Sequence, residues 1–171
     1  MVKIFSFWIF DRHCNCIYAV EFDTDKKEIQ RLTTNTGYMH EKAKLMYGLI
    51  FSMSKLTNTF HQKSIDHKEN DDLFPLETNF KKISTGSYSI HTLKTKTGLI
   101  FSLVTDINDQ DGMETELQRI YREIYLKHIT LNPFEYNDYA LSESETRGEG
   151  FRHIENSNFD KDIYALIENL L

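Results

Sequence analysis

The sequence predicts an α+β fold in which helices pack on an antiparallel sheet. Residues 4–10 and 99–104 are almost continuously apolar, as expected for strands that are buried on both faces. Short polar turns join neighbouring strand-like segments, which is typical of antiparallel hairpins. Other segments repeat apolar residues at helical spacing. The predicted order is two strands, a helix, three strands and two helices, or β-β-α-β-β-β-α-α, with a five-stranded sheet.

The first two strands are predicted to form a hairpin. Residues 4–10 read IFSFWIF, and such a strand belongs in the middle of a sheet. After the polar residues 11–13, residues 14–22 alternate along a second strand. One face of this strand carries Cys16, Tyr18, Val20 and Phe22.

A helix and two polar loops follow the hairpin. Residues 23–40 are mixed in charge and show no period, so we expect a loop there. Residues 41–56 are predicted to be a helix. Its helically spaced stripe is Leu45, Leu49, Met53 and Leu56. Residues 61–79, which contain KENDD, are expected to form a second loop.

Three closely spaced strands are predicted at residues 80–84, 87–95 and 98–105. The last is apolar on both faces and is therefore expected to lie beside the first strand of the chain.

Two helices are predicted in the remaining sequence. Asp111 and Glu114 resemble a capping box that opens a helix over residues 112–130. His128 lies on the apolar stripe of this helix, and we expect a satisfied core or interface residue there in preference to a catalytic base. Residues 134–156, which include TRGEG, are expected to be irregular. Residues 157–171 are predicted to be a final helix.

Length and charge restrict the class of protein. The 171 residues predict one domain over 1–171 that buries a core without disulfides or metal. The net charge of −6 disfavours nucleic acid or an anionic membrane as the main partner. Residues 4–10 are too short for a secretory signal and no cleavage site follows them, so we expect a cytosolic protein with reduced thiols.

Cys14 and Cys16 raise the question of a metal or redox site. A zinc site needs four donors, and neither a second cysteine pair nor a spaced histidine pair accompanies these thiols. We therefore favour structural thiols near a hairpin turn. The sequence also lacks a P-loop, a G-x-S-x-G and a G-x-G-x-x-G motif, so no catalytic residue, cofactor or metal site is predicted.

The helix at 41–56 carries more apolar surface than one sheet can cover. Its apolar residues span an arc of roughly 240°, whereas a helix on one face of a sheet needs about half of that. The excess is centred on Ala43, Tyr47, Ile50 and Phe51, which we predict to form a protein interface. The alternative is that a loop or the C-terminal segment of the same chain covers these residues.

Several segments can be compared together with known families: SFWIFDRHCNCIY (6–18), AKLMYGLIFSM (43–53), ISTGSYSIHT and TGLIFSLVTD (within 83–106), IYREIYLKHITLNP (120–133) and TRGEGFRHI (146–154). Together they resemble the small longin-like subunits of the TRAPP (trafficking protein particle) vesicle-tethering complex, in particular the fungal ones. The resemblance covers most of the chain except the loops at 23–40 and 61–79.

The resemblance implies a longin fold and a core structural subunit in ER-to-Golgi transport, peripheral on ER and Golgi membranes. It implies a synbindin-type longin subunit and acyl-binding α/β-plait subunits as partners. It also implies a share in a composite guanine-nucleotide exchange surface for an early-secretory Rab GTPase, with no catalytic residue in this chain. The alternatives are a free-standing longin-like or profilin-like adaptor, or a small metal or redox protein that uses Cys14 and Cys16.

Overall fold

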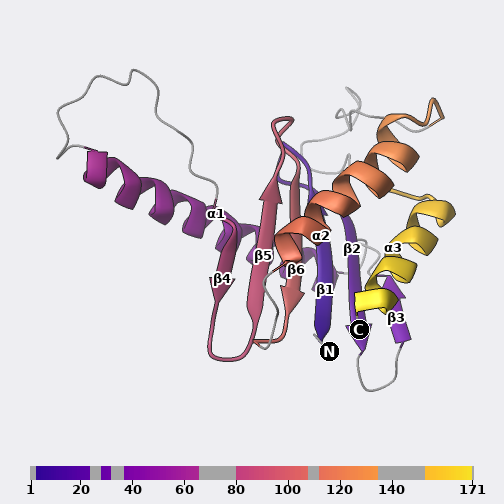
Figure 1. Cartoon of the computed structure of the whole chain (residues 1–171), viewed down its shortest axis with the longest axis horizontal. Coiled ribbons are helices and arrows are strands. Elements are labelled where there is room, and N and C mark those ends of the chain that lie inside the picture. The colour runs from indigo at the N-terminus through magenta and orange to yellow at the C-terminus, as the bar shows by residue number, and fades with distance from the viewer. Residues whose placement is uncertain are drawn as a thin grey trace.

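A computed structural model describes residues 3–23, 28–31, 37–65, 80–107, 112–134 and 153–170 of the chain. One antiparallel sheet has the strand order β3-β2-β1-β6-β5-β4 (Figure 1). The strands are β1 (Ile4–Phe10), β2 (Cys16–Asp23), β3 (Glu28–Arg31), β4 (Lys82–Ser84), β5 (Ser89–Lys94) and β6 (Ile100–Thr105). The helices are α1 (Gly37–Ile65), α2 (Met113–Arg119), η1 (Ile120–Thr130) and α3 (Ser157–Leu170).

The sheet lies between two helical layers, and each layer covers a separate core. Figure 1 shows α2, η1 and α3 on one face and α1 behind the other. Phe7 and Ile9 of β1 join the core under α2, η1 and α3. Trp8 and Phe10 join the core under α1. Successive side chains of β1 therefore enter the two cores in turn, which explains why its sequence is continuously apolar.

The predicted α+β fold and its strand neighbours are confirmed. β1 pairs with β2 on one side and with β6 on the other, so Phe7 lies opposite both Val20 and Leu103. All five predicted strands are present. A sixth, β3, is a short edge strand within residues 23–40, where the sequence predicted only a loop. Its EIQR sequence has no apolar alternation, so a sequence pattern gave no signal for it.

Two helices differ from their predicted bounds. α1 extends beyond residues 41–56 at both ends and includes the first residues of the predicted loop at 61–79. The predicted helix at 112–130 is divided into α2 and η1. η1 is wound more widely, and the Leu131 N–H donates to the Leu126 carbonyl, five residues back, at 2.9 Å. Residues 66–79 and 135–152, which include TRGEG, lie outside the described residues.

The starts of α2 and α3 are capped differently. Gly112, at a φ of 151°, is the N-cap of α2 and offers no side chain, while the predicted cap Asp111 lies outside the described residues. The predicted final helix is confirmed as α3. The Asn156 side-chain oxygen accepts from the Asn158 and Phe159 N–H groups at 3.0 and 3.2 Å, as an N-cap does.

Within the described ranges, no helix combines the length and the apolar character that crossing a membrane requires.

Gly98, in the turn between β5 and β6, is expected to be intolerant of a side chain. Its φ of 87° favours glycine, and a Cβ there would lie 2.9 Å from the Arg12 Cβ in the β1–β2 turn. We expect Gly98→Ala to lower the free energy of unfolding in urea by about 1–3 kcal/mol. Gly86→Ala is the matched control, because no atom lies within 4 Å of its Cβ position. Equal stabilities of the two variants would contradict this expectation.

Candidate interaction surface

The four residues predicted to form an interface do not share one outer face of α1. Ala43 is 6% exposed and Ile50 is 2% exposed, and both pack in the core under α1. Tyr47 is half-buried, whereas Phe51 is 47% exposed. The prediction that all four need a second cover is therefore wrong for Ala43 and Ile50, because the sheet of the same chain covers them.

The helically spaced leucine stripe of α1 is buried only in part. Leu45 is 74% exposed and Leu56 is exposed as well. Leu49 and Met53 are partly buried. Since apolar residues occupy most of the circumference, periodicity alone does not indicate which part of the arc meets the sheet.

Tyr47 and Phe51 form an aromatic flank on one side of α1. Their rings stack with centroids 6.2 Å apart, and the Phe10 ring lies edge-on to Tyr47 at 5.5 Å. The Lys55 Nζ lies 4.7 Å from the centroid of the Phe51 ring. A chain of contacts thus runs from the sheet through the two rings of α1 to the Lys55 ammonium, and its outer end is exposed to solvent.

The β1–β2 turn closes the aromatic flank. Cys14 is exposed, and its thiol lies 2.9 Å from the Tyr47 hydroxyl, where it is the donor. Burial, and then the contact with Cys14, raise the pKa of Tyr47 to about 12, so the phenol is neutral near pH 7. The buried Asp11 carboxylate shapes the turn by accepting from the His13 and Asn15 N–H groups, each at 2.8 Å.

Cys14 and Cys16 have different surroundings. Cys14 has a φ of 69° in the turn and is exposed, while Cys16 is buried in β2. Burial raises the pKa of Cys16 to about 12, so its reactive thiolate form is rare at neutral pH. Across the described part of the chain, no three His, Cys, Asp or Glu side chains are grouped so that they could hold a metal ion.

This difference predicts selective thiol labelling. In the folded chain, Ellman's reagent at pH 8 is expected to react with Cys14 and to leave Cys16 unmodified until denaturant is added. The absorbance of the released product counts the thiols. Cys14→Ser is the control, and its folded form should remain unreactive. Rapid reaction of both thiols in the native protein would contradict the described burial of Cys16.

An open groove runs along the other side of α1. It has a volume of about 520 Å³ and lies between α1 and one end of the sheet. Its lining is Phe5, Ser6, Glu21, Lys42, Leu45, Met46, Leu49, Ser87, Tyr88, Ile90 and Val104. An ion pair between Lys42 and Glu21 forms part of the wall. The exposed Leu45 and Tyr88 side chains leave apolar surface open to solvent at this groove.

No pattern in the sequence predicted this groove. Ile90 comes from β5, Tyr88 directly precedes that strand, and Phe5 comes from β1, so the groove arises only when these strands lie together under α1. The one available signal was the excess apolar arc of α1, which indicated an uncovered surface without locating it.

α1 also extends past the sheet. Its 29 residues correspond to a length of about 44 Å at ~1.5 Å per residue. Six strands span only about 24 Å at a spacing of ~4.8 Å. In Figure 1 the C-terminal half of α1 projects beyond β4. Leu56 and Phe60 of this half are exposed, so apolar side chains continue along the part of the helix that extends past the sheet.

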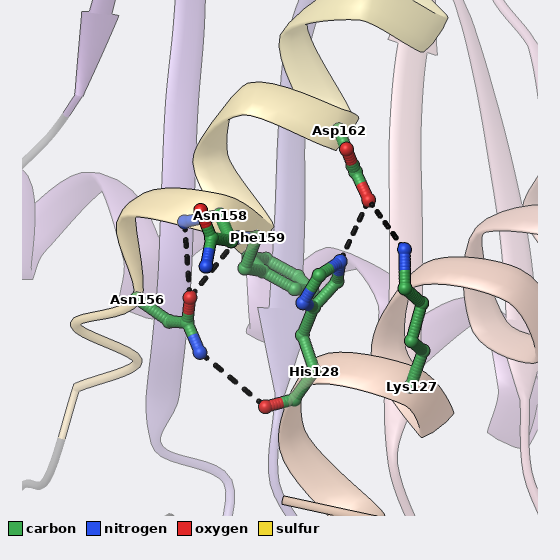
Figure 2. A network of polar contacts seen from close by, with 6 residues as sticks. All are labelled: Lys127, His128, Asn156, Asn158, Phe159 and Asp162. Carbon is green, nitrogen blue, oxygen red and sulfur yellow. Dashed lines mark hydrogen bonds and ion pairs between the residues drawn. The ribbon is translucent and has the colours of Figure 1, made fainter.

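His128 holds η1 against α3 on the opposite face of the sheet. Figure 2 shows the His128 Nε2 facing the Asp162 carboxylate at 2.6 Å, with the Lys127 Nζ at 3.4 Å from the same oxygen. The Asn156 side chain donates to the His128 carbonyl at 3.3 Å. Hydrogen bonding to His128, and then Lys127, lowers the pKa of Asp162. The prediction that His128 is a satisfied residue is confirmed.

Comparisons with known proteins agree with this fold. The model of the Sybindin-like family matches residues 4–161. The chain is 40% identical over 156 residues to the trafficking protein particle complex subunit BET5 of Saccharomyces cerevisiae, across 91% of this chain and 90% of that protein. It is 26% identical to trafficking protein particle complex subunit 1 of Dictyostelium discoideum, across 76% of this chain and 79% of that protein.

A human relative extends the same group. The chain is 24% identical to human trafficking protein particle complex subunit 1, across 77% of this chain and 78% of that protein. These relatives confirm the resemblance to small subunits of the trafficking protein particle complex. The chain belongs to the Sybindin-like family.

Proposed function

We propose that this chain is a core structural subunit of a TRAPP vesicle-tethering complex that acts in ER-to-Golgi transport. The observation that carries the proposal is the uncovered surface of α1, which combines an apolar groove with an overhanging helical half. The relatives of this chain are named as subunits of the trafficking protein particle complex. A subunit of a stable assembly is expected to leave such a surface open when it is alone.

The partners that we propose are a synbindin-type longin subunit and acyl-binding α/β-plait subunits. The groove offers a concave apolar site with the polar Lys42–Glu21 pair in its wall. The overhang offers Leu56 and Phe60 to a neighbour beyond β4. A partner that fills both would bury apolar area now in water, which favours association by roughly 25 cal/mol per Å² before the costs of binding.

We further propose that the assembled complex promotes nucleotide exchange on an early-secretory Rab GTPase and that this chain contributes only surface. Opening a nucleotide site requires a partner that binds the opened conformation better than the closed one. A share of that differential affinity can come from contacts alone, without a catalytic side chain. The complex would work on the cytoplasmic side of ER and Golgi membranes and would hold this chain there.

Nucleotide release tests the proposal. A fluorescent GDP analogue bound to an early-secretory Rab GTPase should be released slowly in the presence of this chain alone. The complete complex should accelerate release, and the complex without this chain should lose most of that acceleration. Full exchange by the isolated chain, or by the other subunits without it, would contradict the proposal. A chain that stays monomeric among these subunits would instead favour a free-standing adaptor.

A further inference from the structure

We infer that α1 binds an acidic segment of a partner protein through a basic aromatic patch, which consists of Tyr47, Phe51, Lys44, Lys55 and Arg12. This inference rests on the proposed function, because it assigns a chemistry to the partner surface that meets α1. The patch lies on the side of α1 that carries the aromatic flank, and the groove contains none of these five residues.

The charge of α1 is opposite to that of the whole chain. The chain carries a net charge of −6, but α1 contains four lysines and a single acidic residue, Glu41, which is exposed three residues before Lys44. Lys42 is paired with Glu21 at the groove. Lys44 and Lys55 are exposed, and among the described residues neither amine lies in an ion pair. A local positive surface on an acidic protein is what a specific acidic partner would select.

Helix geometry places both lysines beside the rings. Lys44 precedes Tyr47 by three residues and Phe51 by seven, and Lys55 follows Phe51 by four, so all four side chains share one side of α1. The Lys55 Nζ already lies 4.7 Å from the centroid of the Phe51 ring. A carboxylate that reached Lys55 would therefore meet a cation whose side chain is ordered against an aromatic ring.

The β1–β2 turn adds a third cation to the patch. The Cys14 thiol contacts the Tyr47 hydroxyl at 2.9 Å, and the exposed Arg12 lies two residues before it in the same turn. The carboxylate of this turn, Asp11, is buried and accepts from His13 and Asn15. It is thus engaged within the turn, whereas Arg12 is exposed and its Nε donates to the His13 Nε2 at 3.2 Å.

The shape of the patch favours a protein segment over a membrane surface. The Tyr47 and Phe51 rings stack along the helix. They form a partly desolvated aromatic surface of a size that one short protein segment can cover. An anionic bilayer attracts a broad cationic surface, and the net charge of −6 on this chain opposes that approach. Acidic side chains of a partner at the rim of an interface would set its register and its rate of association.

Zero-length cross-linking tests the inference in the complete complex. The complex, purified through a tag on the full-length chain, is treated with a water-soluble carbodiimide, which joins a lysine amine to a carboxylate in contact with it. Peptide mass spectrometry is expected to find Lys44 or Lys55 joined to an aspartate or glutamate of another chain. The inference is wrong if both lysines stay unjoined and accept an amine reagent as readily as in the isolated chain.

Charge reversal supplies an independent measurement. We expect Lys44→Glu combined with Lys55→Glu to slow association with the complex that lacks this chain by about tenfold or more at low salt, and to flatten the salt dependence. Lys44→Gln with Lys55→Gln should have an intermediate effect. Arg122→Glu with Lys161→Glu is the matched control, because both residues are exposed on the opposite helical layer. Equal rates for the two charge-reversed variants would overturn the inference.

Two further outcomes separate the possible failures. Co-sedimentation of the chain with phosphatidylserine-containing vesicles, lost in the Lys44→Glu, Lys55→Glu variant, would assign the patch to a membrane and overturn the inference. If the chain does not co-purify with other subunits at all, the proposed function fails. If it co-purifies but shows neither the cross-links nor the change in salt dependence, only the present inference fails.

Discussion

Replacing Leu45 with glutamate is expected to abolish co-purification of the chain with its partner subunits, while the chain itself still folds. Leu45 lines the groove and is 74% exposed, so a carboxylate there remains hydrated in the isolated protein. In a desolvated contact the same unpaired charge costs on the order of 3 kcal/mol or more. This corresponds to a loss of affinity of about a hundredfold. Phe51→Glu should act in the same direction on the other side of α1.

Two variants serve as controls for Leu45→Glu. Leu131→Glu introduces the same change at a leucine that is 76% exposed at the end of η1, and it should leave co-purification intact. Ile50→Glu places the charge in the core under α1 and should unfold the isolated chain, as circular dichroism would show. Retained co-purification of a folded Leu45→Glu variant would show that the groove is not an interface.

Truncating Phe159 is expected to produce the largest loss of stability among simple substitutions in α3. Its ring is fully buried at the start of the helix, edge-on to Tyr18 with centroids 5.0 Å apart and to Tyr125 at 6.5 Å. Phe159→Ala removes these contacts and leaves a cavity between β2, η1 and α3. We expect the free energy of unfolding to fall by about 3–5 kcal/mol.

Urea unfolding followed by circular dichroism measures this effect. Phe134→Ala is the matched control, because that ring is 90% exposed and its loss should change stability by less than about 0.5 kcal/mol. A total stability of about 5–15 kcal/mol is usual for a protein, so the Phe159 variant should be visibly less stable at room temperature. Similar midpoints for the two variants would contradict the docking of α3 seen here.

The sheet was largely predictable from the sequence because its strands carry strong signals. β1 and β6 are apolar on both faces, which placed them side by side at the centre, and the structure pairs them. β3 escaped prediction because an edge strand of four residues is stabilised by pairing with β2 and not by its own pattern. The extension of α1 past residue 56 was missed for a similar reason, since its later residues are mostly polar, with only Phe60 and Ile65 apolar, and show no period.

The candidate surface was predictable only in part. The excess apolar arc correctly indicated that α1 is incompletely covered by the sheet, and Phe51 is indeed exposed. The arc did not reveal that Ala43 and Ile50 face the sheet and that Leu45 faces solvent. The orientation of α1 depends on its contacts with Trp8, Phe10 and other strand residues of the core under α1, all of which are distant from the helix in sequence. Periodicity within a helix carries no information about those partners.

Hydrogen–deuterium exchange of the chain, alone and in the assembled complex, tests the central claim that a partner covers α1. The overhanging half of α1 makes few contacts with the rest of the chain, so its backbone hydrogen bonds should open and its amides should exchange readily when the chain is isolated. Assembly is expected to slow exchange in peptides from residues 45–60 at least tenfold, and to leave peptides from α3 unchanged. Unaltered exchange across α1, with new protection confined to α3 or η1, would contradict the claim and place the interface on the opposite face of the sheet.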